Sequence, residues 1–254
     1  MGVQTIGRKP KATPIEVFEE NIADAQRLVD LSSSLRNRRK RRMRQELRQT
    51  FGEAMDIPRN KRDGLDCVES EDVFVVLKPG GNAARSHFTE QELRPLLRQA
   101  VVAIGAAVES YVAEKACCYI REALRSDNPP RRLLEIPVSL RDVLWIEDSY
   151  QRRGWGHRTL VEEYLRAEAS ADPGKIGQVF STVGRRKFWG PVDARRSVPA
   201  GTSERHLSAL AERRNLIAHT GDRVGGGKAV LEIDEVQWHL SHAKAIVEAL
   251  DAVL

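Results

Sequence analysis

The segment RRNLIAHTGD, at residues 213–222, groups three side chains that could act on a phosphate. Arg214, Asn215 and His219 fall within about one and a half turns if the segment is helical, as its apolar spacing predicts. An imidazole can relay protons when a ribose 2′-hydroxyl attacks the neighbouring phosphodiester, and a guanidinium can hold the extra charge of the pentacovalent phosphate. An asparagine can orient either group. These residue types at this spacing predict metal-independent cleavage of RNA.

Arg214 interrupts an apolar stripe on the predicted helix. The stripe consists of Leu207, Leu210, Ala211 and Ile217, which recur at three- and four-residue steps. An arginine keeps its charge near neutral pH, so its burial costs several kcal/mol unless it finds anionic or hydrogen-bonding partners. A buried carboxylate, a subunit boundary or a bound phosphate would each make this position tolerable.

RNLIAH at 214–219 resembles the R-x4-6-H signature of the HEPN superfamily (higher eukaryote and prokaryote nucleotide-binding), in the form with a polar residue directly after the arginine. LLRQAVVAIGAAVESYV at 96–112 resembles the long first core helix of prokaryotic HEPN ribonucleases of the RiboL-PSP-HEPN-like type. Asp222 stands three residues after the histidine, as in one subgroup. The resemblance covers residues 89–254 and does not reach the N-terminal arginine cluster.

The resemblance implies an all-α fold with a HEPN-like four-helix core, in a homodimer whose two signature helices meet at a composite cleft. It implies an endoribonuclease that leaves 2′,3′-cyclic phosphate and 5′-hydroxyl ends and uses neither metal nor cofactor, in a toxin–antitoxin or phage-defence setting. In that reaction His219 would be the general base or acid, Arg214 the transition-state stabiliser and Asn215 the orienting group. The apolar stripe around Arg214 would then face the partner subunit.

Glu109, Asp222 and Arg213 are candidates for a supporting role around these three side chains. Glu109 could equally be the ion-pair partner of a cation inside the bundle, Arg214 included. Two other functions stay open, namely a non-catalytic HEPN-like module that binds RNA or protein, and a helical partner of a nucleotidyltransferase antitoxin. An antitoxin or defence-system protein is a possible partner in each case.

The basic residues are concentrated in one segment. The chain has a formal net charge of +5, yet Arg36 to Arg48 alone holds eight basic residues and a single acid. A polyanion-binding arm has this charge distribution, while a solvated helix face or an ion-pair belt against a partner subunit would have it too. The residues predicted to contact RNA here are Arg38, Arg39, Lys40, Arg41, Arg42 and Arg44.

Two further segments, QRRGWGHR at 151–158 and GRRKFWG at 184–190, place arginine beside tryptophan between glycines. Single-stranded RNA is bound by such mixtures because aromatic faces stack on bases and guanidinium groups meet phosphates. A tryptophan that anchors a loop to the core is the structural alternative. The predicted RNA contacts are Arg152, Arg153, Trp155, Arg185 and Arg186.

Hydrophobic periodicity predicts a helical protein. We divide the chain into a disordered basic tail at 1–12, an N-terminal helical arm at 13–88 and the HEPN-like domain at 89–254. Thr13, Pro14 and Glu16 predict a capped helix that Ser32–Ser34 interrupts before a second helix with the arginine cluster. The expected later elements are a short strand or an extended lid at 73–78, helices at 95–124, 140–150, 157–168, 173–184 and 203–219, and a last helix from Asp234.

Other classes of protein fit the sequence less well. With 41% apolar residues the chain can build a sizeable core, but its longest unbroken apolar run is too short to span a bilayer and no signal-peptide segment is evident, so we expect a cytoplasmic protein. The three cysteines suit neither a disulfide framework nor a thiolate metal site. GDRVGGGK at 221–228 departs from the phosphate-loop pattern and predicts a flexible connection. His239 and His242 have no further metal ligands at a recognisable spacing.

Overall fold

A computed structural model describes residues 12–36, 39–69, 74–77, 90–148 and 153–254. Apart from Ala12, the predicted tail lies outside these residues, as do Arg38 and Arg152. Helices make up most of the described chain, which confirms the all-α class; its strands form one three-stranded and one two-stranded sheet.

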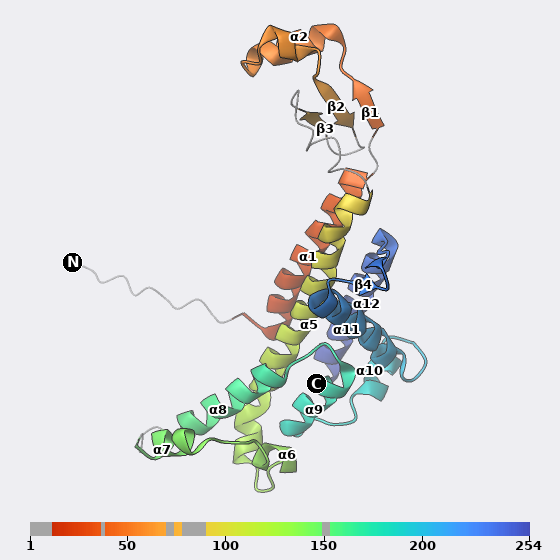
Figure 1. Ribbon diagram of the computed structural model, residues 1–254. Coiled ribbons are helices and arrows are strands. Elements are labelled where there is room, and N and C mark those ends of the chain that lie inside the picture. Colours follow the sequence, from red (N-terminus) through yellow and green to blue (C-terminus); the bar gives the residue numbers. More distant parts are fainter. Residues whose placement is uncertain (1–11, 37–38, 70–73, 78–89, 149–152) are drawn as a thin grey trace, which may run out of the picture.

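Four long helices form the main body (Figure 1). Their bounds are α1 Pro14–Arg36, α5 Glu90–Arg125, α11 Thr202–Thr220 and α12 Ile233–Val253. Figure 1 shows α1 alongside α5 over much of the length of both, while α12 packs against both of these helices and α11 packs against α5 and α12. The predicted apolar faces of α5 and α12 are buried in one common core, as their helical spacing indicated.

Helix α1 belongs to this core, although we predicted it as part of a separate arm. Phe18, Ile22, Ala25 and Val29 are all buried in the same cluster as α5. The predicted cap is present, because the Thr13 N–H donates to Glu16 Oε2 at 2.7 Å and the Glu16 N–H to Thr13 Oγ1 at 3.4 Å. The predicted break is wrong: the helix runs on through its serines to Arg36 because packing against α5 outweighs their weak helix propensity. The core therefore does not divide at residue 89.

The segment after α1 forms a small unit of its own, which Figure 1 shows beyond one end of α1 and α5. It has a three-stranded antiparallel sheet in the order β1-β2-β3 and a small cluster of Met43, Ile57 and Leu65. Its elements are β1 Arg39–Arg42, α2 Gln45–Ala54, α3 Arg59–Arg62, β2 Asp66–Glu69 and β3 Phe74–Leu77. The strand predicted at 73–78 is confirmed by β3.

The arginine-rich helix that we predicted is instead a strand. Arg39–Arg42 pair with β2 in a register that sets Arg39 opposite Glu69 and Arg42 opposite Asp66, and the following helix begins only at Gln45. Arginine and lysine favour helices in isolation, but pairing with a strand more than twenty positions away overrides that local preference here.

Shorter elements complete the main body. Asp172 caps α9, since its carboxylate accepts from the Lys175 N–H at 2.9 Å. The predicted cap of the last helix differs, because α12 begins at Ile233 and its N-cap position, Glu232, makes no side-chain capping bond. The remaining bounds are α6 Arg131–Leu134, α7 Leu140–Asp148, α8 Arg153–Glu168, α9 Pro173–Thr182, α10 Trp189–Arg195, β4 Arg223–Val224 and β5 Gly227–Lys228.

The stretch Gln91–Arg125 of α5 is long and apolar enough to cross a membrane by length and composition alone. Core helices of soluble proteins meet the same criteria, and 61% of its most apolar window is buried inside the protein. Since α1, α8, α11 and α12 all pack on it, α5 serves as the central core helix.

Candidate functional site

Helix α11 carries Arg214, Asn215 and His219 and is fixed at both ends. At its start, the buried Asp193 carboxylate accepts from the N–H groups of Gly201 at 2.7 Å and Ser203 at 2.9 Å. At its end, Gly221 adopts the left-handed conformation with φ of 62° and its N–H bonds to the Ile217 carbonyl at 3.1 Å. The helix that positions the three side chains is therefore well defined.

Arg214 forms an ion pair with a carboxylate on α5. Its Nη2 lies 3.3 Å from Glu109 Oε2, and its Nη1 donates to Asn215 Oδ1 at 3.1 Å. The side chain is 29% exposed, so part of the guanidinium stays open to solvent. Its stem crosses α5 at Gly105, where an added Cβ would lie 3.2 Å from Arg214 Cγ. Glu109 is thus the bundle's ion-pair partner for Arg214, one of the two roles predicted for it.

His219 lies on the same side of α11 as Asn215, four residues further along the helix. Its side chain is exposed, and it makes no hydrogen bond or ion pair with any residue that the structure describes. Asn215 thus bonds Arg214 and shares a helix face with His219, whereas Arg214 and His219 project from the helix about 140° apart and do not contact each other. We name these three side chains the α11 cluster.

Asp222 and Arg213 belong to a different arrangement, which is closed. The Asp222 side chain is fully buried, with Oδ2 2.7 Å from Arg98 Nε and Oδ1 2.9 Å from Arg213 Nη1. Arg98 also donates to the Ala229 carbonyl and Arg213 to the Val230 carbonyl, each at 2.9 Å. These bonds hold the hairpin of β4 and β5 against α5 and α11. Asp222 is out of reach of a substrate, and we name this arrangement the Asp222 network.

Arg98 is a residue that we did not single out from the sequence. It lies on α5 and meets Asp222 across 124 positions of the chain, so no local spacing relates the two. One signal was present, since Arg98 is a charge within the apolar periodicity of α5 and is itself buried. A charge at such a place needs a buried partner.

The apolar stripe of α11 does not face outward, contrary to our expectation of a subunit boundary. Leu207 and Leu210 are each 1% exposed and Ile217 is 8% exposed, all within the core of this one chain. The stripe is covered because α11 packs on both α5 and α12. Arg214 lies beside the stripe and reaches Glu109, so a partner subunit is not required to explain its position.

The predicted RNA-contacting arginines lie in separate parts of the molecule. Arg44 is exposed just before α2, and for Arg39, Lys40, Arg41, Arg42, Arg153 and Trp155 the structure describes the backbone alone. Figure 1 shows β1 and the start of α8 at opposite ends of the protein, so they do not meet at the α11 cluster. Arg186 is exposed, whereas Arg185 pairs with Glu122 at 2.7 Å and covers the Tyr119 ring.

A group of aromatic rings joins α11 to α12. His206 contacts His242 and Trp238, with ring centroids 4.0 and 4.8 Å away, and Trp238 also contacts His239. Burial, together with His242 and nearby arginines, lowers the pKa of His206 to about 4, and burial with Arg213 lowers the pKa of His239 to about 4. In the described part of the chain, no three His, Cys, Asp or Glu side chains are grouped to hold a metal ion. The helix spacing of His239 and His242 could not predict the contact with His206.

Comparison with known proteins gives no match to a family model, a curated protein or a solved structure.

Proposed function

We propose that the protein is a metal-independent endoribonuclease of the HEPN type, with the α11 cluster as its catalytic group. The observation that supports this most is the position of Arg214, Asn215 and His219 in the last two turns of α11, where Arg214 donates to Asn215 and the exposed His219 lies one turn beyond Asn215. The resemblance of RNLIAH to the HEPN signature supports the same assignment.

In the proposed reaction, His219 accepts the proton of a ribose 2′-hydroxyl, whose oxygen then attacks the adjacent phosphorus. The bond from phosphorus to the 5′-oxygen breaks, and that oxygen leaves with a proton from a general acid. The products are a 2′,3′-cyclic phosphate and a 5′-hydroxyl end. Arg214 holds the extra negative charge on the phosphate oxygens by charge-assisted hydrogen bonds, which are stronger than neutral ones.

Two supporting residues would hold Arg214 for this task. Glu109 fixes Nη2 from α5 and Asn215 fixes Nη1 from the same helix, which leaves donors on the guanidinium for a phosphate. We assign Glu109 as a positioning residue. Arg213 and Asp222 hold the fold of this region and take no part in the chemistry.

The reaction needs both a base and an acid, and each chain offers one exposed imidazole in this cluster. A second copy placed with its own α11 cluster opposite would supply the other His219, as the resemblance to HEPN proteins implies. Since the leucines of α11 are buried within the chain, such a contact would have to form around the polar cluster and not through the apolar stripe.

The deciding experiment incubates the purified protein with a mixed RNA pool in EDTA and identifies the ends of the fragments. We expect 2′,3′-cyclic phosphate and 5′-hydroxyl ends, no effect of EDTA, and loss of cleavage in His219→Ala. The matched control is His157→Ala, because His157 is an exposed histidine on α8, away from the cluster. Cleavage that depends on added magnesium, or that persists unchanged in His219→Ala, would contradict the proposal.

One observation favours a second function. The Glu109–Arg214 ion pair could serve as a polar contact between helices in a non-catalytic module that binds RNA or protein. RNA binding without cleavage, unaffected by His219→Ala, would support that function. A cytoplasmic toxin or phage-defence effector, with an antitoxin or nucleotidyltransferase partner, remains the proposed biological setting.

A further inference from the structure

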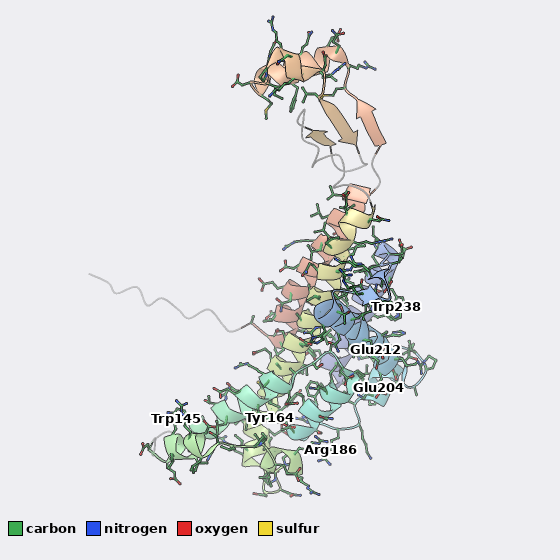
Figure 2. The ribbon with its side chains drawn as sticks, in the orientation of Figure 1. Trp145, Tyr164, Arg186, Glu204, Glu212 and Trp238 are labelled. Carbon is green, nitrogen blue, oxygen red and sulfur yellow. The ribbon has the colours of Figure 1, made fainter. Side chains whose placement is uncertain are left out.

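Exposed apolar side chains are concentrated around α7. Six large ones, each at least 40% exposed, occur within residues 134–145. Contiguous apolar patches on a soluble protein mark sites of interaction, whereas scattered single residues do not. The six are Leu134, Val138, Leu140, Val143, Leu144 and Trp145. Figure 2 shows Trp145 at the outer end of the protein, well separated from Trp238 on α12.

Helix α7 is anchored on one side and apolar on the other. On the inner side Ile146 is buried and packs so closely on α8 that a Cβ added to Gly156 would lie 2.9 Å from Ile146 Cγ1. On the outer side Leu140, Val143 and Leu144, spaced by three and four residues, are 73%, 40% and 54% exposed. The outer side is thus a largely apolar helix face, with the exposed Glu147 one turn beyond Val143, which is held in a fixed orientation and is left uncovered by the residues that the structure describes.

The charged residues that border this face are complementary to the same residues of a second copy. Arg141 and Asp148 are exposed and make no ion pair or hydrogen bond in the described parts of the chain. They are seven residues apart and therefore lie on the same flank of the helix, within about 20° of each other. When two identical helices pack antiparallel about a two-fold axis, equivalent flanks meet. Arg141 of each copy would then lie beside Asp148 of the other.

We infer that two copies of this chain associate through α7, packed antiparallel, with the apolar face at the centre and two Arg141–Asp148 ion pairs at the edges. A membrane surface suits the face less well, because three acids, Asp142, Glu147 and Asp148, accompany the single arginine on α7. Figure 1 shows α7 far from the hairpin that follows α11, so this contact goes beyond the proposed function and does not depend on it.

Charge exchange between two variants tests the arrangement. Arg141→Glu and Asp148→Arg should each raise the dissociation constant of the dimer by about tenfold or more, because each places like charges side by side twice. Mixing the two variants should restore association, since every contact in the mixed pair again joins opposite charges. The double variant should associate like the natural protein. Arg121→Glu, at an exposed site on α5, controls for the change in net charge.

Sedimentation velocity at about 50 mM salt, where screening is weak, measures these constants, and circular dichroism checks that each variant is folded. Leu144→Glu should abolish association through α7 with the fold intact. A natural protein that stays monomeric at about 100 µM would overturn the inference, whether the face then binds another protein or nothing. So would a dimer that these variants leave unchanged, or two charge variants that fail to associate when mixed. RNA cleavage by the charge variants is a separate readout, and its loss or retention bears only on the proposed function.

Discussion

Arg213 and Arg214 are neighbours in the sequence, yet they belong to opposite kinds of environment. Arg213 is 14% exposed, forms ion pairs with Asp222 and Glu235 and donates to the Val230 carbonyl, while its buried Nε makes no hydrogen bond. Arg214 is 29% exposed, has one carboxylate at 3.3 Å and keeps part of its guanidinium open. Successive residues of a helix point about 100° apart, which is enough to send one toward the hairpin and the other toward α5 and solvent.

This difference separates what stabilises the protein from what can act on a ligand. The Asp222 network is buried and its charges are paired within the chain, so loss of a member should lower the free energy of unfolding. The α11 cluster is exposed and incomplete, so loss of a member should lower activity and leave stability nearly unchanged. Each of the following changes tests one side of that division.

The largest effect is expected for Asp222→Asn. The substitution leaves Arg98 and Arg213 without their buried carboxylate, while asparagine tolerates the positive φ of 66° at this position. Breaking a buried ion pair costs about 3–5 kcal/mol, and urea unfolding would measure it. The exposed Asp127→Asn is the matched control. A loss under about 1 kcal/mol would show that the network is no more than a surface contact.

Arg214→Ala should have the opposite profile. We expect RNA cleavage to fall about 100- to 1,000-fold, because a donor to the transition state is lost. Stability should change by no more than about 1 kcal/mol, as for a half-exposed ion pair. The companion variant Arg213→Ala should unfold at lower urea concentration. If both arginines affected stability alike and neither affected cleavage, the division between the two regions would be wrong.

Low pH should lower the stability of the fold through the buried His239. The pKa of His239 is about 4 in the folded protein and about 6.5 when unfolded, so the unfolded chain binds more protons between these values. Stability from this residue is complete above pH 6.5 and is lost as the pH falls toward 4, by at most about 3 kcal/mol. His239→Leu should flatten the pH dependence of the urea midpoint. An unchanged slope would exclude His239 as its cause.

The smallest effect is expected at the arginines farthest from both regions. Replacing Arg38, Arg39, Arg41 and Arg42 with glutamine should weaken RNA binding by about tenfold and flatten its salt dependence, because phosphate contacts release counterions. The rate of cleavage of bound RNA should stay the same. A fourfold substitution of the exposed Arg121, Arg125, Arg132 and Arg195 with glutamine is the control for net charge. An unaltered salt slope would favour a solvated strand over an RNA-binding arm.

Local signals in the sequence were reliable where the physics is local. The cap of α1 at Thr13 involves residues three apart, so spacing alone predicted it. The buried faces of α5 and α12 followed from a single periodicity. The residues of the α11 cluster were predicted together for the same reason, since all three lie on one helix.

Features that depend on distant partners were not predictable in this way. The strand β1 exists because β2 pairs with it, and the sequence of Arg39–Arg42 taken alone favours a helix. Whether the apolar stripe of α11 packs in the core or at a subunit interface depends on which helices cover it. The leucines of the stripe suit both places, so the sequence could not distinguish them. One partner of Asp222, Arg98, lies 124 positions away.

The position of Asp222 also bears on how this protein can open. Its N–H bonds the Leu216 carbonyl and its own carbonyl accepts from the Ala229 N–H, while its carboxylate holds arginines of α5 and α11. The hairpin thus cannot peel away alone without stranding two cations, so opening it should expose the end of α11 and the start of α5 together. This hairpin has strands of only two residues each and lies at the surface, yet it would then exchange its amide hydrogens as slowly as the core, within the same cooperative unit.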